Sequence, residues 1–186
     1  MGFLFDPIMS ILEEKAIHIG VSSCLLGNKV RYDGQDKKHS NVLKLCERFT
    51  CIAICPEYAI DLGVPRPPIH LVQLASGIRA RGIANPQQDV TDALTEYADE
   101  VHESLPQLCG YIFKARSPSC GVNSTPLLDA TGMQQLGTTN GIYSGRIQQL
   151  AEQLPIVEET RLNTDDDLQK FIKDVLAYSN TTLRQP

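Results

Sequence analysis

Three of the six cysteines lie in short motifs that each follow an apolar run typical of a buried strand. The motifs are VSSCLLG at 21–27, ICPE at 54–57 and KARSPSCG at 114–121. Because loops at the carboxyl ends of parallel strands converge on one crevice, Cys24, Cys55 and Cys120 are expected to meet there. Three thiolates are one short of a closed four-thiolate site. Such a set leaves a bound metal or iron–sulfur cluster with an open position, where chemistry can occur.

The other three cysteines, Cys46, Cys51 and Cys109, have positions typical of core residues. Cys46 falls on the apolar face of a predicted helix, and Cys51 and Cys109 fall at the beginnings of predicted strands. The spacing of Cys46, Cys51 and Cys55 is similar to a cluster motif, but a four-residue strand would separate Cys51 from Cys55 by roughly 13 Å. In a chain expected to be cytosolic, six cysteines favour free thiols, metal binding or catalysis over disulfides.

Length and composition predict one globular domain. The chain has 186 residues, 42% of them hydrophobic, and residues 17–186 are expected to form a single α/β domain behind an N-terminal extension at 1–16. The net charge of -5 disfavours general binding to nucleic acid, since that affinity depends on clustered lysines and arginines. The sequence contains no run of about 18 apolar residues, so no membrane span is predicted. The first residues do not have the pattern of a signal peptide, so a cytoplasmic location is expected.

Strand and helix patterns alternate along the chain, which predicts a Rossmann-like, doubly wound, mostly parallel sheet flanked by helices. The predicted strands of this sheet are 17–21, 51–54, 111–114 and 155–158. The predicted helices are 7–15, 41–49, 89–105, 141–154 and 165–178. Two further runs, at 69–74 and 78–83, predict a small hairpin insertion. The glycine-rich motifs that bind nucleotide phosphates do not occur, so a nucleotide cofactor is not supported.

Five motifs together give the chain a resemblance to a bacterial family linked to 2-thiouracil desulfurase and long catalogued as a domain of unknown function. The resemblance extends from about residue 17 to residue 158. The motifs that carry it are residues 21–27, KVRYDG at 29–34, CPE at 55–57, PRPP at 65–68 and SPSCG at 117–121.

The resemblance implies a [4Fe-4S] cluster held by Cys24, Cys55 and Cys120, with one iron left open. It implies that Glu57 is the catalytic acid and base and that Ser117 is the catalytic serine. The expected reaction removes sulfur from a thiolated pyrimidine and gives the oxo base. The sulfur is expected to leave on the open iron as hydrosulfide, with no net electron transfer.

The expected substrate-binding residues are Ser22, Ser23, Arg66 and Ser119, which lie within these motifs. Two roles remain open for Arg66, which lies among three prolines. It either contacts a pyrimidine carbonyl or holds its own loop through backbone contacts.

The expected partner is a small thiolated base or nucleoside, with no direct binding of tRNA and no membrane. The oligomeric state does not follow from the sequence. Three other kinds of protein compete with the desulfurase hypothesis. A sulfur-inserting enzyme of tRNA would need an adenylating nucleotide site, for which the sequence has no phosphate-binding loop. A structural or sensing metal-binding module would bind metal without turnover. A thiol-redox enzyme would work without iron, but the chain has no Cys-x-x-Cys motif to support it.

Overall fold

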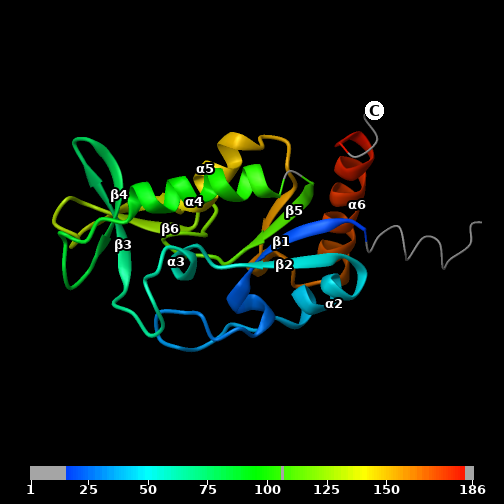
Figure 1. Cartoon of the computed structure of the whole chain (residues 1–186), viewed down its shortest axis with the longest axis horizontal. Helices are drawn as coiled ribbons and strands as arrows, with labels where there is room; N and C mark the ends of the chain where they lie inside the picture. Colours follow the sequence, from blue (N-terminus) through cyan, green and yellow to red (C-terminus); the bar gives the residue numbers. More distant parts are fainter. Residues whose placement is uncertain (1–15, 106, 183–186) are drawn as a thin grey trace, which may run out of the picture.

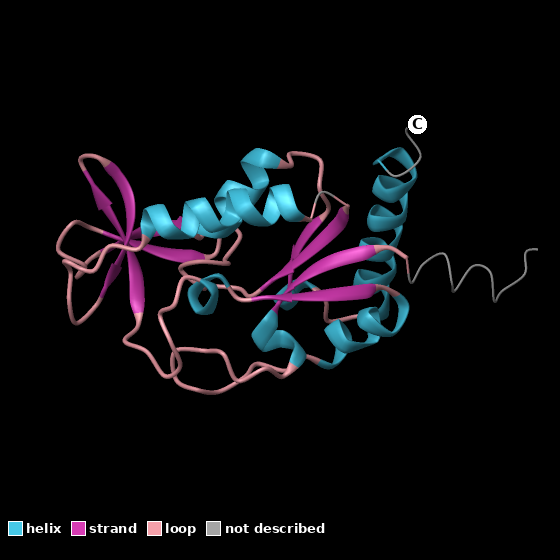
Figure 2. Ribbon diagram, viewed as in Figure 1, coloured by secondary structure: helices cyan, strands magenta, loops and turns pink. Residues whose placement is uncertain are grey.

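Two four-stranded sheets and the helices around them make up the described part of the protein (Figures 1 and 2). The structure is a computed structural model and describes residues 16–105 and 107–182. The helix expected at 7–15 lies outside the described residues. No helix within the described ranges has the length and apolar character needed to cross a membrane.

Sheet A is the predicted parallel sheet. Its strands are, in spatial order, β2 (Thr50–Ile54), β1 (His18–Ser22), β5 (Leu108–Phe113) and β8 (Ile156–Glu158). Every neighbouring pair is parallel. All six residues of β5 are buried, as expected for a central strand covered on both faces. The carboxyl ends of β1, β2 and β5 therefore point to the same edge of the sheet.

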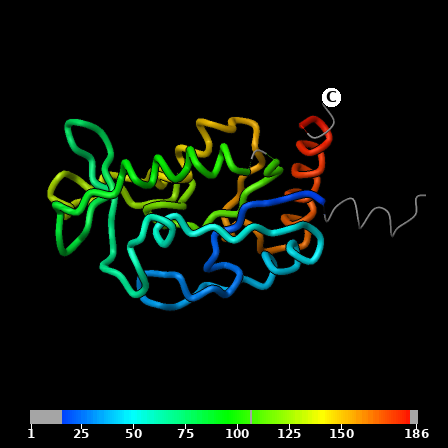
Figure 3. Tube along the Cα trace, in the orientation of Figure 1, coloured from blue at the N-terminus to red at the C-terminus, as the bar shows by residue number. Residues whose placement is uncertain are grey.

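Helices cover both faces of sheet A, which confirms the doubly wound α/β fold. One face packs against α2 (Ser40–Arg48) and α6 (Asp165–Thr182), and the other against α4 (Thr91–Ser104) and α5 (Ile142–Leu150). Strand β1 and helix α6, from opposite ends of the described chain, lie side by side (Figure 3). Their contact is apolar, with Ile19, Phe171 and Val175 all lying against Gly110 of β5.

Sheet B extends the predicted hairpin into a mixed sheet. Its strands are, in order, β4 (Gly77–Gly82), β3 (Ile69–Leu74), β6 (Thr125–Leu128) and β7 (Gln135–Thr139). The β3–β4 hairpin is antiparallel, as predicted, and β6 joins β3 in parallel. The hairpin is thus half of a second sheet instead of a small insertion.

Helix α4 connects the two sheets. Leu94 in its first half packs on sheet B with Leu71 and Val90, whereas Ala98 and Val101 in its second half pack on sheet A. The helix predicted at 89–105 therefore contributes apolar side chains to two cores. Figure 1 shows this helix running from β4 toward the strands of sheet A.

Three short elements complete the described fold. They are the single-turn helix α3 (Pro56–Ala59) and the 3-10 helices η1 (Ser23–Leu26) and η2 (Glu159–Arg161). All three directly follow strands of sheet A, so they lie at the edge where the cysteine motifs were expected.

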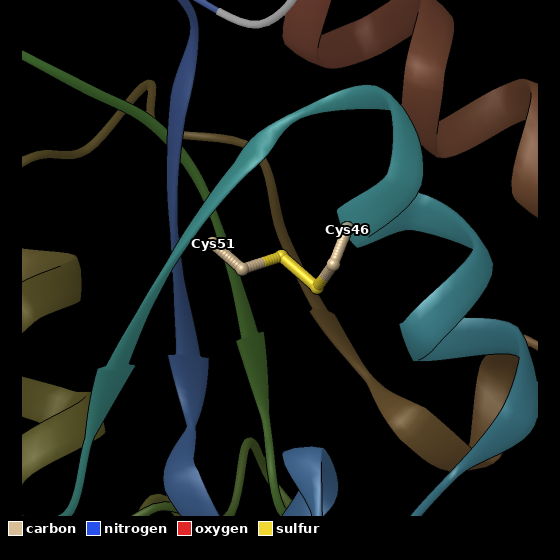
Figure 4. The surroundings of a disulfide bond; sticks show 2 residues. All are labelled: Cys46 and Cys51. Atoms are coloured by element: carbon tan, nitrogen blue, oxygen red, sulfur yellow. A yellow bond between two sulfur atoms is a disulfide. The ribbon is translucent and has the colours of Figure 1, made fainter.

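The prediction that Cys46 and Cys51 are buried core thiols is wrong, because they form a disulfide (Figure 4). Helix α2 ends at Arg48 and β2 begins at Thr50, so the chain turns sharply between them. This turn brings the two half-buried cysteines together, with their Cα atoms 5.4 Å apart. Cys109 is a buried free thiol, as predicted.

Candidate active site

A cavity of about 390 Å³ lies where the carboxyl ends of β1, β2 and β5 meet. Cys24, Cys55 and Cys120 all line it, and all three are free thiols. Each comes from a different strand end: Cys24 lies in η1 after β1, Cys55 directly follows β2, and Cys120 lies in the loop after β5. The cavity also contains Glu57 and Ser117, the other two residues expected to act in catalysis.

Cys24 and Cys120 are buried, Cys55 is half-buried, and the three thiols influence one another's protonation. Burial raises the pKa of Cys24 to about 11, and the neighbouring Cys55 adds to the rise while Arg31 and Lys114 oppose it. Burial also raises the pKa of Cys55, and it raises that of Cys120 well above its ordinary value, with further increases from Cys55, Glu57 and Cys24. These interactions require the thiols to lie near one another. Without a bound cation the three thiols are therefore protonated at neutral pH, and a metal would have to displace their protons.

The donor set is compatible with an iron–sulfur cluster, because it consists of cysteine thiols. Within the described ranges, no three histidine, cysteine or acidic side chains are grouped so as to hold one metal ion. A cuboidal iron–sulfur cluster is larger than an ion, and each of its thiolates binds a different iron atom. Three thiols spread around one cavity satisfy that requirement, since they need not converge on a common point.

Glu57 is held by partners from two other segments. Its Oε2 accepts a hydrogen bond from Nε of Arg66 at 3.0 Å and lies 2.9 Å from Nη2 of the same residue. Its Oε1 accepts a hydrogen bond from Oγ of Ser119 at 2.9 Å. The Pro56 that follows Cys55 begins helix α3, and Glu57 occupies the next position in it. The motif Cys-Pro-Glu thus places a thiol and a carboxylate side by side.

Ser117 organises the loop that carries Cys120. Its Oγ accepts hydrogen bonds from the backbone N–H groups of Ser119 at 3.3 Å and Cys120 at 3.1 Å. The preceding Arg116 has φ of +60°, a left-handed conformation that is uncommon outside glycine. This backbone is stabilised by a hydrogen bond from the Arg116 N–H to Oγ of Ser124. The loop is therefore a tightly bonded turn with a hydroxyl at the cavity.

Gly141 at the start of α5 allows that loop to approach the helix. A Cβ atom at this position would lie 2.4 Å from the carbonyl carbon of Ser119 and 2.7 Å from the amide nitrogen of Cys120. Both contacts are with backbone, which cannot move aside as a flexible side chain can. Only glycine permits this packing, and the packing fixes where Cys120 lies.

Two consecutive glutamates, which the sequence analysis did not identify, hold both ends of the same loop. Glu158 ends β8 and accepts hydrogen bonds from the N–H of Val122 and from Oγ of Ser124. Glu159 is ion-paired with Lys114 and accepts a hydrogen bond from the N–H of Ala115 at 2.7 Å. Both glutamates are buried. Paired acidic residues at the end of a buried strand are the signal that could have revealed them, because buried charges need partners.

The four expected substrate-binding residues differ in position. Ser22, Ser23 and Arg66 line the cavity, whereas the fully buried Ser119 lies behind Glu57 and is not part of the lining. Oγ of Ser22 accepts a hydrogen bond from the N–H of Lys114, and Oγ of Ser23 accepts one from Asn28. The guanidinium of Arg66 donates hydrogen bonds to backbone carbonyl oxygens, which corresponds to the loop-holding role left open for it by the sequence.

The cavity lining is positively charged although the whole chain is acidic. Its five cationic residues, against the single acidic residue Glu57, are Arg31, Lys37, Arg66, Lys114 and Arg116. Arg79 and Arg81 do not belong to it, since they form ion pairs with Asp89 beside sheet B. The lining therefore favours polar or electron-rich ligands.

Comparisons with known proteins agree with the motifs. The chain is 27% identical over 155 residues to the uncharacterized protein YbbK of Bacillus subtilis, covering 77% of this chain and 96% of the relative. A solved structure, the [4Fe-4S]-dependent thiouracil desulfidase TudS, superposes with a TM-score of 0.59 at 24% identity. The superposition covers 87% of this chain and 99% of the TudS chain, which supports the α/β fold. A family model described as 2-thiouracil desulfurase matches residues 19–159, a span that contains every residue predicted for the site. The chain therefore belongs to the 2-thiouracil desulfurase family.

Proposed function

We propose that this protein is an iron–sulfur-dependent desulfurase that replaces the sulfur of a thiolated pyrimidine, such as 2-thiouracil, with oxygen. The observation that carries the proposal is one cavity lined by three free thiols, a carboxylate and a serine. The family to which the chain belongs supports the reaction type. The [4Fe-4S] dependence of TudS supports the choice of cofactor.

Cys24, Cys55 and Cys120 are the residues that would hold a [4Fe-4S] cluster. When bound, the cluster would supply an iron atom without a protein ligand, a Lewis acid for the sulfur of a thiocarbonyl group. Cys109 cannot contribute, since it lies in the core and does not line the cavity.

Glu57 is the group that moves protons in this scheme. Its carboxylate takes a proton from a water molecule as the water oxygen adds to the thiocarbonyl carbon. Glu57 returns this proton to the sulfur. The second proton of the water then passes from the new hydroxyl to Glu57 as the carbon–sulfur bond breaks, which leaves the carbonyl product, hydrosulfide and one proton that Glu57 releases to solvent. The exchange of sulfur for the oxygen of water needs no oxidant or reductant.

Ser117 is suited to donate a hydrogen bond to the substrate. Because its Oγ already accepts two backbone N–H groups, its own O–H is left to donate. A donor at this position would stabilise negative charge as it develops on the reacting group.

The proposed substrate is a small thiolated base or nucleoside. A cavity of about 390 Å³ is near the lower end of the range for pockets that enclose small ligands. Absence of direct tRNA binding and a cytoplasmic location both stay predictions.

The test is anaerobic reconstitution with iron and sulfide, followed by an assay of hydrosulfide release from 2-thiouracil in the same sample. Single alanine variants of Cys24, Cys55 and Cys120 are compared with Cys109→Ala, a matched control that also removes a buried thiol. We expect cluster absorbance and hydrosulfide release in the wild type and the control, and the loss of both in the three site variants.

Other outcomes identify the competing hypotheses. A cluster without hydrosulfide release would favour the sensing or structural module. Hydrosulfide release without iron would contradict the cofactor assignment and favour thiol chemistry.

A further inference from the structure

We propose that Arg66 and Ser119 are positioning residues that fix the carboxylate of Glu57, instead of residues that bind substrate. This inference rests on the proposed function, because it assigns them a role through the proposed acid and base. It replaces the role expected from the sequence for both residues.

The two oxygens of Glu57 are held from different parts of the chain. Arg66, in the loop before β3, contacts Oε2 with Nε at 3.0 Å and Nη2 at 2.9 Å. Ser119, in the loop after β5, donates to Oε1 at 2.9 Å. Contacts to both oxygens restrict rotation of the carboxyl group about its last bond, which is otherwise broad in proteins. Three of the four lone-pair sites of the carboxylate are then occupied, which leaves one on Oε1 for a ligand in the cavity that Glu57 lines.

Glu57 needs such contacts because its own element is short. Helix α3 has four residues, too few to fix a long side chain through packing along its length. The side chain of Glu57 is 13% exposed, so it is accessible from the cavity while most of it is covered by its partners. Side-chain contacts thus fix the orientation of the Glu57 side chain, as packing along a longer helix would.

Both partners use their polar groups within the protein, although Arg66 also lines the cavity. Nη1 of Arg66 donates to the carbonyl oxygens of Val30 and Gly63, both at 2.9 Å, and the guanidinium contacts the side chains of Glu57 and Cys55. The Arg66 side chain is 4% exposed. Ser119 is fully buried and does not line the cavity. The hydrogen bonds of both residues are used within the protein.

Steady-state kinetics separate the two roles. A positioning residue affects the chemical step, so Ser119→Ala and Arg66→Lys should lower kcat for 2-thiouracil by about 10-fold to 100-fold and leave KM unchanged within about twofold. Iron content and cluster absorbance should equal those of the wild type. Ser179→Ala in α6 and Arg146→Lys in α5 are matched controls away from the cavity, and both should keep the wild-type kcat.

A double variant tests whether the effect passes through Glu57. In a Glu57→Gln background, Ser119→Ala should cause no further loss of kcat, because the group that it positions is already gone. Ser119→Ala carries this test even if Arg66→Lys fails to fold, since Oγ of Ser119 bonds to a single partner, Glu57, among the described contacts.

Three results in the Ser119→Ala variants would contradict a positioning role. They are a raised KM with unchanged kcat in Ser119→Ala, loss of the cluster in that variant, or additive losses in the double variant. A wild type that binds iron but releases no hydrosulfide would overturn the proposed function and this inference together. An active wild type with an unaffected Ser119→Ala variant would overturn the inference alone.

Discussion

Sheets A and B have four strands each but differ in what stabilises them. In sheet A the central strand β5 is buried along its whole length between helices. In sheet B four of the five residues of β7 are exposed, and a cluster of ion pairs joins Arg79 and Arg81 to Asp89 and Asp92 beside β4. Sheet A presents three strand ends to the cavity, whereas sheet B lines it at Ile69 alone. The comparison indicates that the proposed chemistry belongs to the edge of sheet A, whereas sheet B adds surface ion pairs to its own apolar core.

The largest expected effect is at the edge of sheet A. Glu57→Gln keeps the size of the side chain but removes the group that accepts a proton, so kcat should fall by about 10²-fold to 10⁴-fold. The cluster should be retained, which iron content and absorbance would verify alongside the kinetics. Loss of the cluster in this variant would show that Glu57 has a structural role at the metal site.

A substitution beside sheet B should affect stability instead. Asp89 accepts hydrogen bonds from Arg79 at 2.8 Å and from Oγ1 and N–H of Thr91, at the start of α4. We expect Asp89→Asn to lower the free energy of unfolding by about 1.5–3 kcal/mol, because it removes hydrogen bonds to a charged acceptor. Denaturant titration measures this loss, and kcat at saturating substrate should remain at the wild-type value. A loss of kcat comparable to that of Glu57→Gln would show that the region beside sheet B also affects catalysis, which would contradict the proposed difference between the sheets.

The Cys46–Cys51 disulfide offers a second test within sheet A, away from the cavity. It closes a short loop, with a sequence separation of 5, so the chain-entropy model gives it about 2 kcal/mol of stability. The Cys46→Ser/Cys51→Ser double variant should unfold at correspondingly lower denaturant concentration. Its cluster content and kcat should not change. Iron loss would instead mean that the start of β2 controls the position of Cys55 at its other end.

The smallest effect is a dependence of stability on pH that arises from Asp89. Burial acts to raise the pKa of this carboxyl, but hydrogen bonds from Arg79, Thr91 and Arg81 outweigh it and hold the pKa well below the ordinary value of 3.8. A lowered folded-state pKa gives stability that is fully present above the unfolded value and is lost as pH falls below it. The difference in unfolding free energy between wild type and Asp89→Asn should therefore shrink as pH decreases from about 5 toward 2. A difference that stays constant over this range would contradict the role given to Asp89.

The sequence predicts sheet A well and sheet B poorly, for reasons that lie in the residues. Apolar runs such as Ile17–Val21 mark buried strands clearly. The exposed β7 has no alternation of apolar and polar residues, and β6 contains Pro126, which argues against an interior strand. Pro126 is tolerated because β6 pairs with β3 at Leu127 and Leu128.

The motifs predicted the site residues, but they did not predict which residues those side chains contact. Local spacing places Cys55 and Glu57 together at one strand end. It does not show that Arg66, nine residues after Glu57, turns back to it, since the path of a proline-rich loop is set by tertiary contacts. The disulfide was missed for a similar reason, because the turn at Phe49, the one residue between α2 and β2, decides whether Cys46 meets Cys51.

Two cysteines at opposite ends of strand β2 have sulfur in different oxidation states. Cys51, near its start, is oxidised in the disulfide, and Cys55, just after its end, is a free thiol. A thiol reductant used to protect the three cavity thiols during purification would also act on the disulfide. Preparations made with and without reductant are then distinct covalent species, so stability values should be compared only between samples whose free thiols have been counted.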